Sequence, residues 1–77
     1  MTVNRDSADI RMLKEAEVRA MTGLSRVTRW RMEDRGEFPQ RVLLGARRVS
    51  WVESEVVAWL EDRIKNHRRT IEHRDNG

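Results

Sequence analysis

The sequence EAEVRAMTGLSRVTRWRMEDRGEF, residues 15–38, predicts two short helices joined by a tight turn. The turn falls at Thr22-Gly23-Leu24, where Gly23 can adopt a positive φ and end the first helix at little cost. Ser25 follows as an N-cap, because its hydroxyl can accept a hydrogen bond from a free N–H in the next turn. Two helices around a glycine turn, with arginines along the second, are typical of helix-turn-helix DNA binding.

The second helix is predicted over residues 25–35, with its end at Gly36. On a helical wheel, one side groups Arg26, Arg29 and Glu33, which predicts that Arg26 and Arg29 are exposed. The other side is a wide arc that holds Val27, Thr28, Trp30 and Met32 and encloses Arg31. The wheel leaves Trp30 open between a core residue and a stacking residue. We expect it in the core, where tryptophan is found more often.

The segments before this helix are a polar arm and a first helix. Residues 1–9 have no apolar period and are predicted to be disordered, and residues 10–13 form a short strand or an extended lead-in. The first helix is predicted over residues 14–21. Its core-facing residues are expected to be Leu13, Val18, Met21 and Leu24, and its outward residues Glu15, Glu17 and Arg19.

A change of character follows at Phe38-Pro39, since Pro39 pushes the residue before it toward extended geometry. Two β-prone runs, residues 41–44 and 47–51, flank Gly45-Ala46 and predict a short hairpin. Arg47 would lie at its tip with Arg48 beside it. The hairpin is either a simple connector or the wing of a winged helix-turn-helix.

A third helix is predicted from a capping box formed by Ser50 and Glu53. An apolar stripe, predicted to be packed core, comprises Val52, Val56, Val57, Trp59, Leu60 and Ile64. The outer side is acidic, with Glu53, Glu55, Glu61 and Asp62, which makes it a poor DNA face. We expect one helix-turn-helix domain over residues 10–66 and a flexible basic tail over residues 67–77.

The composition bounds the class of protein. A chain of 77 residues suffices for one small domain, and no cysteine is available for disulfides or thiolate metal sites. No apolar run approaches the length of roughly 18 residues that a membrane span needs, so we expect a cytoplasmic protein without membrane contact. Residues 25–48 hold seven arginines against three acidic residues. This concentration of arginine favours phosphate and base contacts.

An enzyme is not expected, and neither are catalytic residues, a cofactor or a metal site. His67 and His73 lie six apart in the predicted tail without a cysteine or a carboxylate constellation. The adjacent side chains of Glu33 and Asp34 diverge on a helix. RNA binding is disfavoured too, because the aromatic-rich sheet that stacks bases is missing.

Three segments in order resemble the AlpA family of small prophage-type regulators: MTGLSRVTRWRMEDRGEFP (21–39), LLGARRVSW (43–51) and SEVVAWLEDRI (54–64). The resemblance covers residues 12–63. It implies a mainly α fold with a small β-hairpin, a winged helix-turn-helix related to MerR-like DNA-binding domains. The implied function is transcription regulation in a prophage or mobile element. Two alternatives are an excisionase, which bends attachment-site DNA and assists an integrase, and a protein-interaction module that uses the acidic side of the third helix.

The resemblance also implies site residues. Residues 25–36 would be the recognition helix and residues 42–51 the wing, with Trp51 and Trp59 as core markers. In the family the position of Arg29 is usually aliphatic and buried, so Arg29 would have to snorkel toward water or a phosphate. Arg31 comes nearer to DNA than the wheel suggests. The expected DNA-binding residues are Ser25, Arg26, Thr28, Arg29, Trp30, Arg31, Arg35, Arg41, Arg47 and Arg48.

The expected partner is double-stranded DNA, with Arg26, Thr28 and Arg31 nearest the base edges and Ser25, Arg35 and Arg41 near phosphates. Arg47 and Arg48 would reach a flanking backbone or a narrow minor groove. One short helix contacts only a few base pairs, and a sequence that short cannot specify a single site in a genome. We therefore expect self-association on DNA over adjacent half-sites. A site-specific integrase is a further partner under the excisionase alternative.

Overall fold

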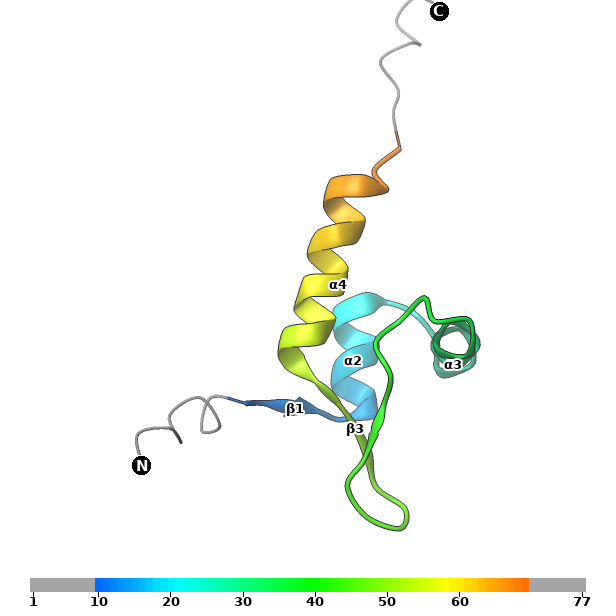
Figure 1. The fold of residues 1–77 in the computed structure, drawn as a ribbon, viewed down its shortest axis with the longest axis vertical. Coiled ribbons are helices and arrows are strands. Elements are labelled where there is room, and N and C mark those ends of the chain that lie inside the picture. Colours follow the sequence, from blue (N-terminus) through cyan, green and yellow to red (C-terminus); the bar gives the residue numbers. More distant parts are fainter. Residues whose placement is uncertain (1–9, 70–77) are drawn as a thin grey trace, which may run out of the picture.

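The computed structural model describes residues 10–69 (Figure 1). The elements in chain order are β1 (Met12–Leu13), α2 (Glu15–Thr22), α3 (Arg26–Asp34), β2 (Val42–Leu43), β3 (Val49–Val52) and α4 (Glu53–Asn66). Helices dominate and the strands form a small antiparallel sheet, which confirms the predicted winged helix-turn-helix class. The predicted arm, residues 1–9, and residues 70–77 of the predicted tail lie outside the described residues.

The turn between α2 and α3 forms as local rules require. Gly23 has a φ of 75°, and its N–H donates a hydrogen bond of 2.7 Å to the carbonyl of Arg19. Ser25 caps α3, because its Oγ accepts a hydrogen bond of 3.2 Å from the backbone N–H of Thr28. These two residues end one helix and begin the next within three positions, which brings α3 back across α2.

The sheet has β3 at its centre. β3 pairs antiparallel with β1, where Leu13 faces Trp51, and antiparallel with β2, where Leu43 faces Val49. The predicted hairpin is confirmed, and its loop is closed by a bond of 2.8 Å from the N–H of Leu44 to the carbonyl of Arg48. The predicted lead-in is therefore an edge strand that ties the start of the domain to the base of the wing.

The predicted capping box of the last helix is wrong. α4 begins at Glu53 with Val52 as its N-cap, and no side chain makes a capping hydrogen bond there. Ser50 is instead a buried residue of β3 and pairs with Val42. The pairing of β3 with both neighbours holds its residues extended, so the helix cannot start before the strand ends.

The buried core is small and consists of Leu13, Val18, Phe38, Trp51 and Val56. Five further residues pack against it and are partly buried: Leu24, Met32, Val49, Trp59 and Leu60. The predictions for Leu13, Val18 and Leu24 are confirmed, whereas Met21 is exposed. Trp51 is a full core residue. Trp59 lies at the rim, where its ring meets Phe38 edge-on at 4.8 Å between centroids.

The prediction that the whole apolar stripe of α4 is packed core is wrong. Val56 is buried, but Val57 and Ile64 are exposed. For Ile64 Figure 1 shows the reason, since the C-terminal half of α4 extends beyond the other elements. The stripe continues along the helix past the point where there is anything for it to pack against.

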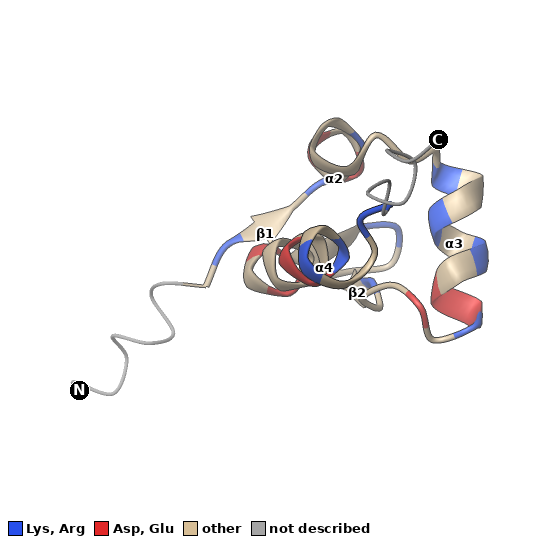
Figure 2. Cartoon of the chain, turned by 90° about the horizontal axis from the view of Figure 1, so that it is seen from above, with Lys and Arg blue, Asp and Glu red and all other residues tan. Residues whose placement is uncertain are grey.

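The second helix in chain order, α3, lies crosswise to the other two. Figure 1 shows α3 end-on while α2 and α4 run up the page, and Figure 2 shows α2 and α4 end-on with α3 lengthwise. One long side of α3 is therefore turned away from the body of the domain.

Between residues 10 and 69, no helix has the length and apolar character needed to cross a bilayer.

Candidate nucleic-acid interface

The outward side of α3 is polar and basic. Arg26, Thr28, Arg31 and Arg35 are exposed on it or at its C-terminal end. The predicted exposure of Arg26 is confirmed, and so is the exposure of Arg31 that the family resemblance implied. In the cartoon of Figure 2, segments coloured for Lys and Arg recur along α3, and the segment coloured for Asp and Glu lies near its C-terminal end. The resulting surface is open to solvent along α3.

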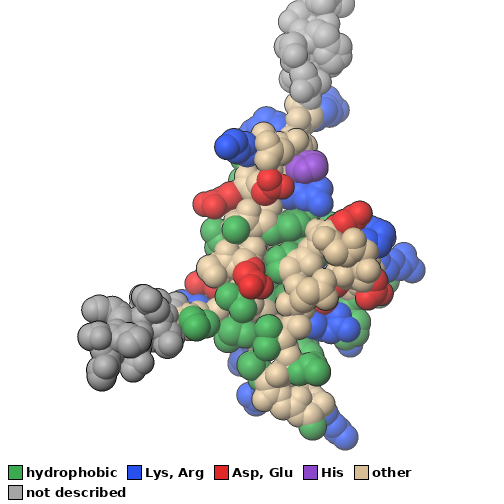
Figure 3. All heavy atoms as spheres, viewed as in Figure 1, with side chains coloured by type: hydrophobic (Ala, Val, Ile, Leu, Met, Phe, Trp, Pro, Cys, Tyr) green, Lys and Arg blue, Asp and Glu red, His purple; other side chains and the backbone are tan. Residues whose placement is uncertain are grey.

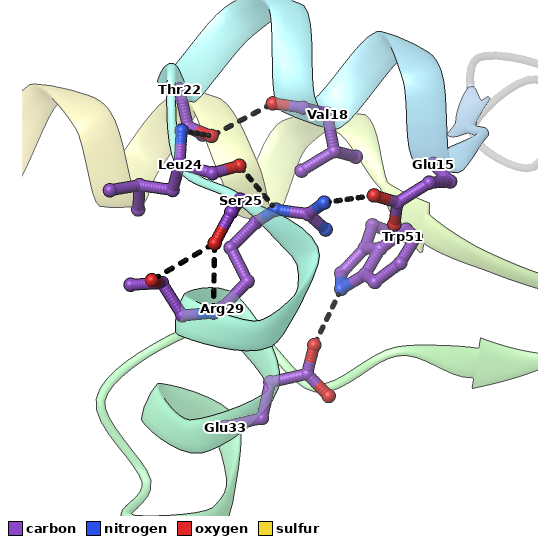
Figure 4. A network of polar contacts seen from close by, with 9 residues as sticks. Glu15, Val18, Thr22, Leu24, Ser25, Arg29, Glu33 and Trp51 are labelled. Atoms are coloured by element: carbon purple, nitrogen blue, oxygen red, sulfur yellow. Dashed lines mark hydrogen bonds and ion pairs between the residues drawn. The ribbon is translucent and has the colours of Figure 1, made fainter.

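Arg29 is buried, and the prediction that it is exposed is wrong. Its exposed fraction is 0%, and its guanidinium lies 5.2 Å from the centre of the Trp51 ring. Nε donates to the carbonyl of Leu24 at 3.2 Å, and Nη2 is ion-paired with the carboxylate of Glu15 (Figure 4). The guanidinium does not snorkel to water, because α2 supplies a carboxylate within its reach.

Glu33 is buried as well, which corrects the wheel that placed it on the exposed side. Its exposed fraction is 3%. Oε2 accepts a bond of 3.0 Å from the indole N–H of Trp51, and Oε1 accepts one of 2.6 Å from the guanidinium of Arg41. Each carboxylate oxygen has a donor, so the charge is held without contact with bulk water.

The buried side of α3 is therefore charged. Arg29 and Glu33 are four residues apart, so they lie one above the other on the same face. Val27, which the wheel placed with the apolar arc, is on the exposed side. The wheel chose the wrong side because it counts charge as a mark of exposure, whereas both of these charges have partners inside the fold.

Arg41 is half-buried rather than free. Its guanidinium bonds to Glu33 and lies over the ring of Trp30 at 3.7 Å from the ring centre. The same residue also offers its backbone N–H to Glu33 at 3.4 Å. Arg41 thus connects the segment after α3 to the helix itself, and its charge is largely met by Glu33.

Trp30 is not a member of the core, contrary to our expectation. It is half-buried and has two guanidinium groups near its ring: that of Arg41, and that of Arg26, which lies 4.8 Å from the ring centre. Its indole N–H is shielded from water and finds no acceptor among residues 10–69. With two guanidinium groups near its centre, the half-buried ring lies at the boundary between the body of the domain and the basic surface.

The Ser25 hydroxyl is already engaged at the start of α3. Besides accepting from the backbone of Thr28, it donates to the Thr28 hydroxyl at 3.0 Å. A phosphate contact by Ser25 would compete with this bond. At the other end of the helix, Arg35 forms an exposed ion pair of 3.0 Å with Glu37.

The wing carries two more exposed cations. Arg47 and Arg48 are exposed at the hairpin loop, and basic side chains stand out there and around α3 in Figure 3. A hollow of about 280 Å³ lies between the loop and α3 and is lined by Glu15, Arg26, Trp30, Ala46, Arg47 and Val49. Arg26 of the helix and Arg47 of the wing thus face one shared concavity.

Two residues that shape this surface were missed from the sequence, namely Glu15 and Glu33. Glu15 was expected to point outward and Glu33 to be a solvated charge. The family resemblance did contain a clue, because it placed position 29 on the buried side of the helix. Glu33 lies one helical turn after Arg29, so the same placement predicts that Glu33 is buried beside Arg29.

Comparison with known proteins gives two matches. The family described as prophage CP4-57 regulatory protein (AlpA) matches residues 11–64, which include every strand and nearly all of the helical residues. The chain is also 42% identical over 64 residues to the uncharacterized protein ORF88 of Enterobacteria phage P4. That match covers 83% of this chain and 73% of the phage protein.

Proposed function

The chain belongs to the AlpA family of prophage regulatory proteins, and from this premise we propose that it regulates transcription by binding specific double-stranded DNA sequences in the cytoplasm. The observation that supports this most is the two-sided build of α3. Its inner side is held by Arg29 and Glu33, and its outer side presents Arg26, Thr28 and Arg31. A helix that recognises bases must be held rigidly against the domain and must also present an unobstructed polar face.

The dimensions of α3 suit the major groove. Nine residues at 1.5 Å each give a rod of about 14 Å, and a helix with side chains is about 10–12 Å wide. The major groove of B-DNA is about 12 Å wide. Arg26 and Arg31 would reach base edges there, and a bidentate contact to guanine discriminates by about 1–3 kcal/mol.

The wing would contribute affinity rather than sequence choice. Arg47 and Arg48 are exposed at the wing, and Arg47 shares a hollow with Arg26 of α3, so we expect them to contact a flanking phosphate or a minor groove. Arg35 would contact a phosphate after it exchanges its exposed partner Glu37. Such contacts are sequence-independent and weaken with salt.

The role of three expected contact residues changes in this proposal. Arg29 and Arg41 position α3 through Glu15 and Glu33 instead of touching DNA. Trp30 would support Arg26 from beneath, since the guanidinium lies over its ring. Stacking restricts the rotamers of Arg26 and orients its donors toward the groove.

Self-association on DNA follows from the short reading length. A rod of about 14 Å faces only about four base steps at 3.4 Å per step. We therefore propose that several copies bind adjacent half-sites. Sedimentation with a duplex that carries repeated sites should give a complex with more than one chain, whereas strictly one-to-one binding would contradict this.

Selection of bound sequences from a random duplex pool, at two salt concentrations, tests the proposal. The expected result is a short motif with repeated spacing and an affinity that falls with salt. Arg31→Ala should weaken the preference for the motif sequence. Arg47→Ala should leave that preference unchanged and lower the affinity. Lys65→Ala, on the far half of α4, is the matched control and should change neither. No salt-dependent affinity for any duplex would overturn the proposal.

The location of the selected motif distinguishes two possible functions of the same DNA-binding face of the protein. Motifs beside a promoter favour the transcription regulator. Motifs beside an attachment site, with bending of the bound duplex and a requirement for an integrase, favour the excisionase. Bending is measured by the mobility of duplexes in which the site is moved from the end to the centre.

A further inference from the structure

Val27 is an apolar side chain on the otherwise polar outer side of α3. It is 58% exposed and belongs neither to the core nor to the residues packed against it. It lines one shallow groove along the helix together with Arg26, Trp30, Arg31 and Asp34. Valine also has lower helix propensity than the alternatives that suit an exposed position. Neither packing inside this domain nor helix formation accounts for a valine here.

We propose that Val27 reads the 5-methyl group of a thymine in the major groove, beside the base contacted by Arg31; this rests on the proposed DNA binding. Thymine is the base whose major-groove edge carries a methyl group, and an apolar side chain is its natural contact. Among the outer-side residues of α3, Val27 has the one wholly apolar side chain. The arginines around it would supply the hydrogen bonds that the methyl group cannot make.

The spacing along α3 places this thymine relative to the Arg31 contact. Val27 and Arg31 are four residues apart, so their Cβ atoms lie about 5–6 Å apart on the same face. Successive bases of one strand are about 3.4 Å apart. The thymine should therefore lie within two base steps of the guanine that Arg31 recognises.

Deoxyuridine substitution isolates the methyl group, because it removes that group and leaves the Watson–Crick edge of thymine intact. The probe is the duplex selected by this chain, with each thymine replaced in turn. The unaltered protein should lose about three- to fivefold in affinity at one thymine, as expected for one buried methyl group. That thymine should lie within two steps of the guanine whose preference is lost in Arg31→Ala.

Two variants complete the design. Val27→Ala should bind the thymine and deoxyuridine duplexes equally well. Its exposed position and the higher helix propensity of alanine predict a melting temperature that is not lowered. Val57→Ala is the matched control, because Val57 is an exposed valine on α4, away from the outer side of α3. It should retain the full difference between the two duplexes.

The outcomes separate the two proposals. If the protein binds DNA selectively but has the same affinity for the thymine and deoxyuridine duplexes at every position, the proposed contact of Val27 with a thymine methyl group is overturned. The proposed function is not affected by that result. A difference that persists undiminished in Val27→Ala would overturn the proposed contact too, since another residue would then contact the methyl group. Loss of all DNA binding in the unaltered protein would overturn the proposed function itself.

Discussion

The guanidinium of Arg29 in α3 is ion-paired with the carboxylate of Glu15 in α2, and this pair joins the two helices of the helix-turn-helix from inside. The environments of the two groups differ. Arg29 has no exposed side-chain surface, whereas 37% of the Glu15 side chain is exposed. The energetic consequences of removing one or the other partner should therefore differ as well.

The first prediction concerns this asymmetry. Glu15→Ala leaves a buried guanidinium without its carboxylate and should lower the free energy of unfolding by about 3–5 kcal/mol. Arg29→Leu restores an aliphatic residue at a buried position and leaves a carboxylate that can turn to water, so its cost should be much smaller. Urea denaturation measures both values. Equal losses for the two variants would contradict the proposed difference.

The second prediction concerns Glu33. Glu33→Gln turns one acceptor oxygen into an N–H₂ group that faces a donor from Trp51 or Arg41. Loss of a hydrogen bond to a charged group costs about 1.5–3 kcal/mol. Asp34→Asn is the matched control on the exposed neighbour and should stay within about 0.5 kcal/mol of the original protein. Comparable effects of the two substitutions in denaturant titrations would be evidence against the buried role of Glu33.

The third prediction separates an arginine that supports the fold from one that is free to bind. Arg41→Ala leaves the buried carboxylate of Glu33 without its cation and should lower the melting temperature. Arg47→Ala should leave the melting temperature unchanged, because Arg47 is exposed at the wing. On a specific duplex, Arg47→Ala should reduce the slope of log affinity against log salt by about 0.9. A stable Arg41→Ala protein would show that the Glu33 carboxylate does not depend on this cation.

The fourth prediction concerns the turn. At Gly23 a Cβ atom would meet no atom within 4 Å, so only the positive φ of 75° opposes a side chain. Gly23→Ala should cost about 1–2 kcal/mol, and Gly23→Asn should cost less because asparagine tolerates the left-handed region. Gly45→Ala, at a glycine without a positive φ, is the control and should be close to neutral. An order in which alanine is better tolerated than asparagine at position 23 would contradict this explanation.

Much of the fold could be predicted from the sequence because its determinants are local. Gly23 and Ser25 mark the turn through their own backbone and hydroxyl chemistry, and the alternation around Gly45-Ala46 marks the wing. The exposed residues of the candidate interface could be predicted from the sequence in the same way, since Arg26, Arg47 and Arg48 are exposed as the sequence pattern indicates. The start of α4 could not be predicted in this way, because the pairing of β3 on both edges overrode a capping sequence at Ser50.

The amino-acid sequence by itself determined which segments are helices and strands, where the chain turns, and that the segment after Gly23 carries the arginines. Only the tertiary structure decided which of those charges lie inside. Arg29 finds Glu15 fourteen positions away, and Glu33 finds Trp51 eighteen positions away and Arg41 eight away. A charge is buried only when a partner is close enough to offset its lost hydration, and such partners meet only when the chain has folded.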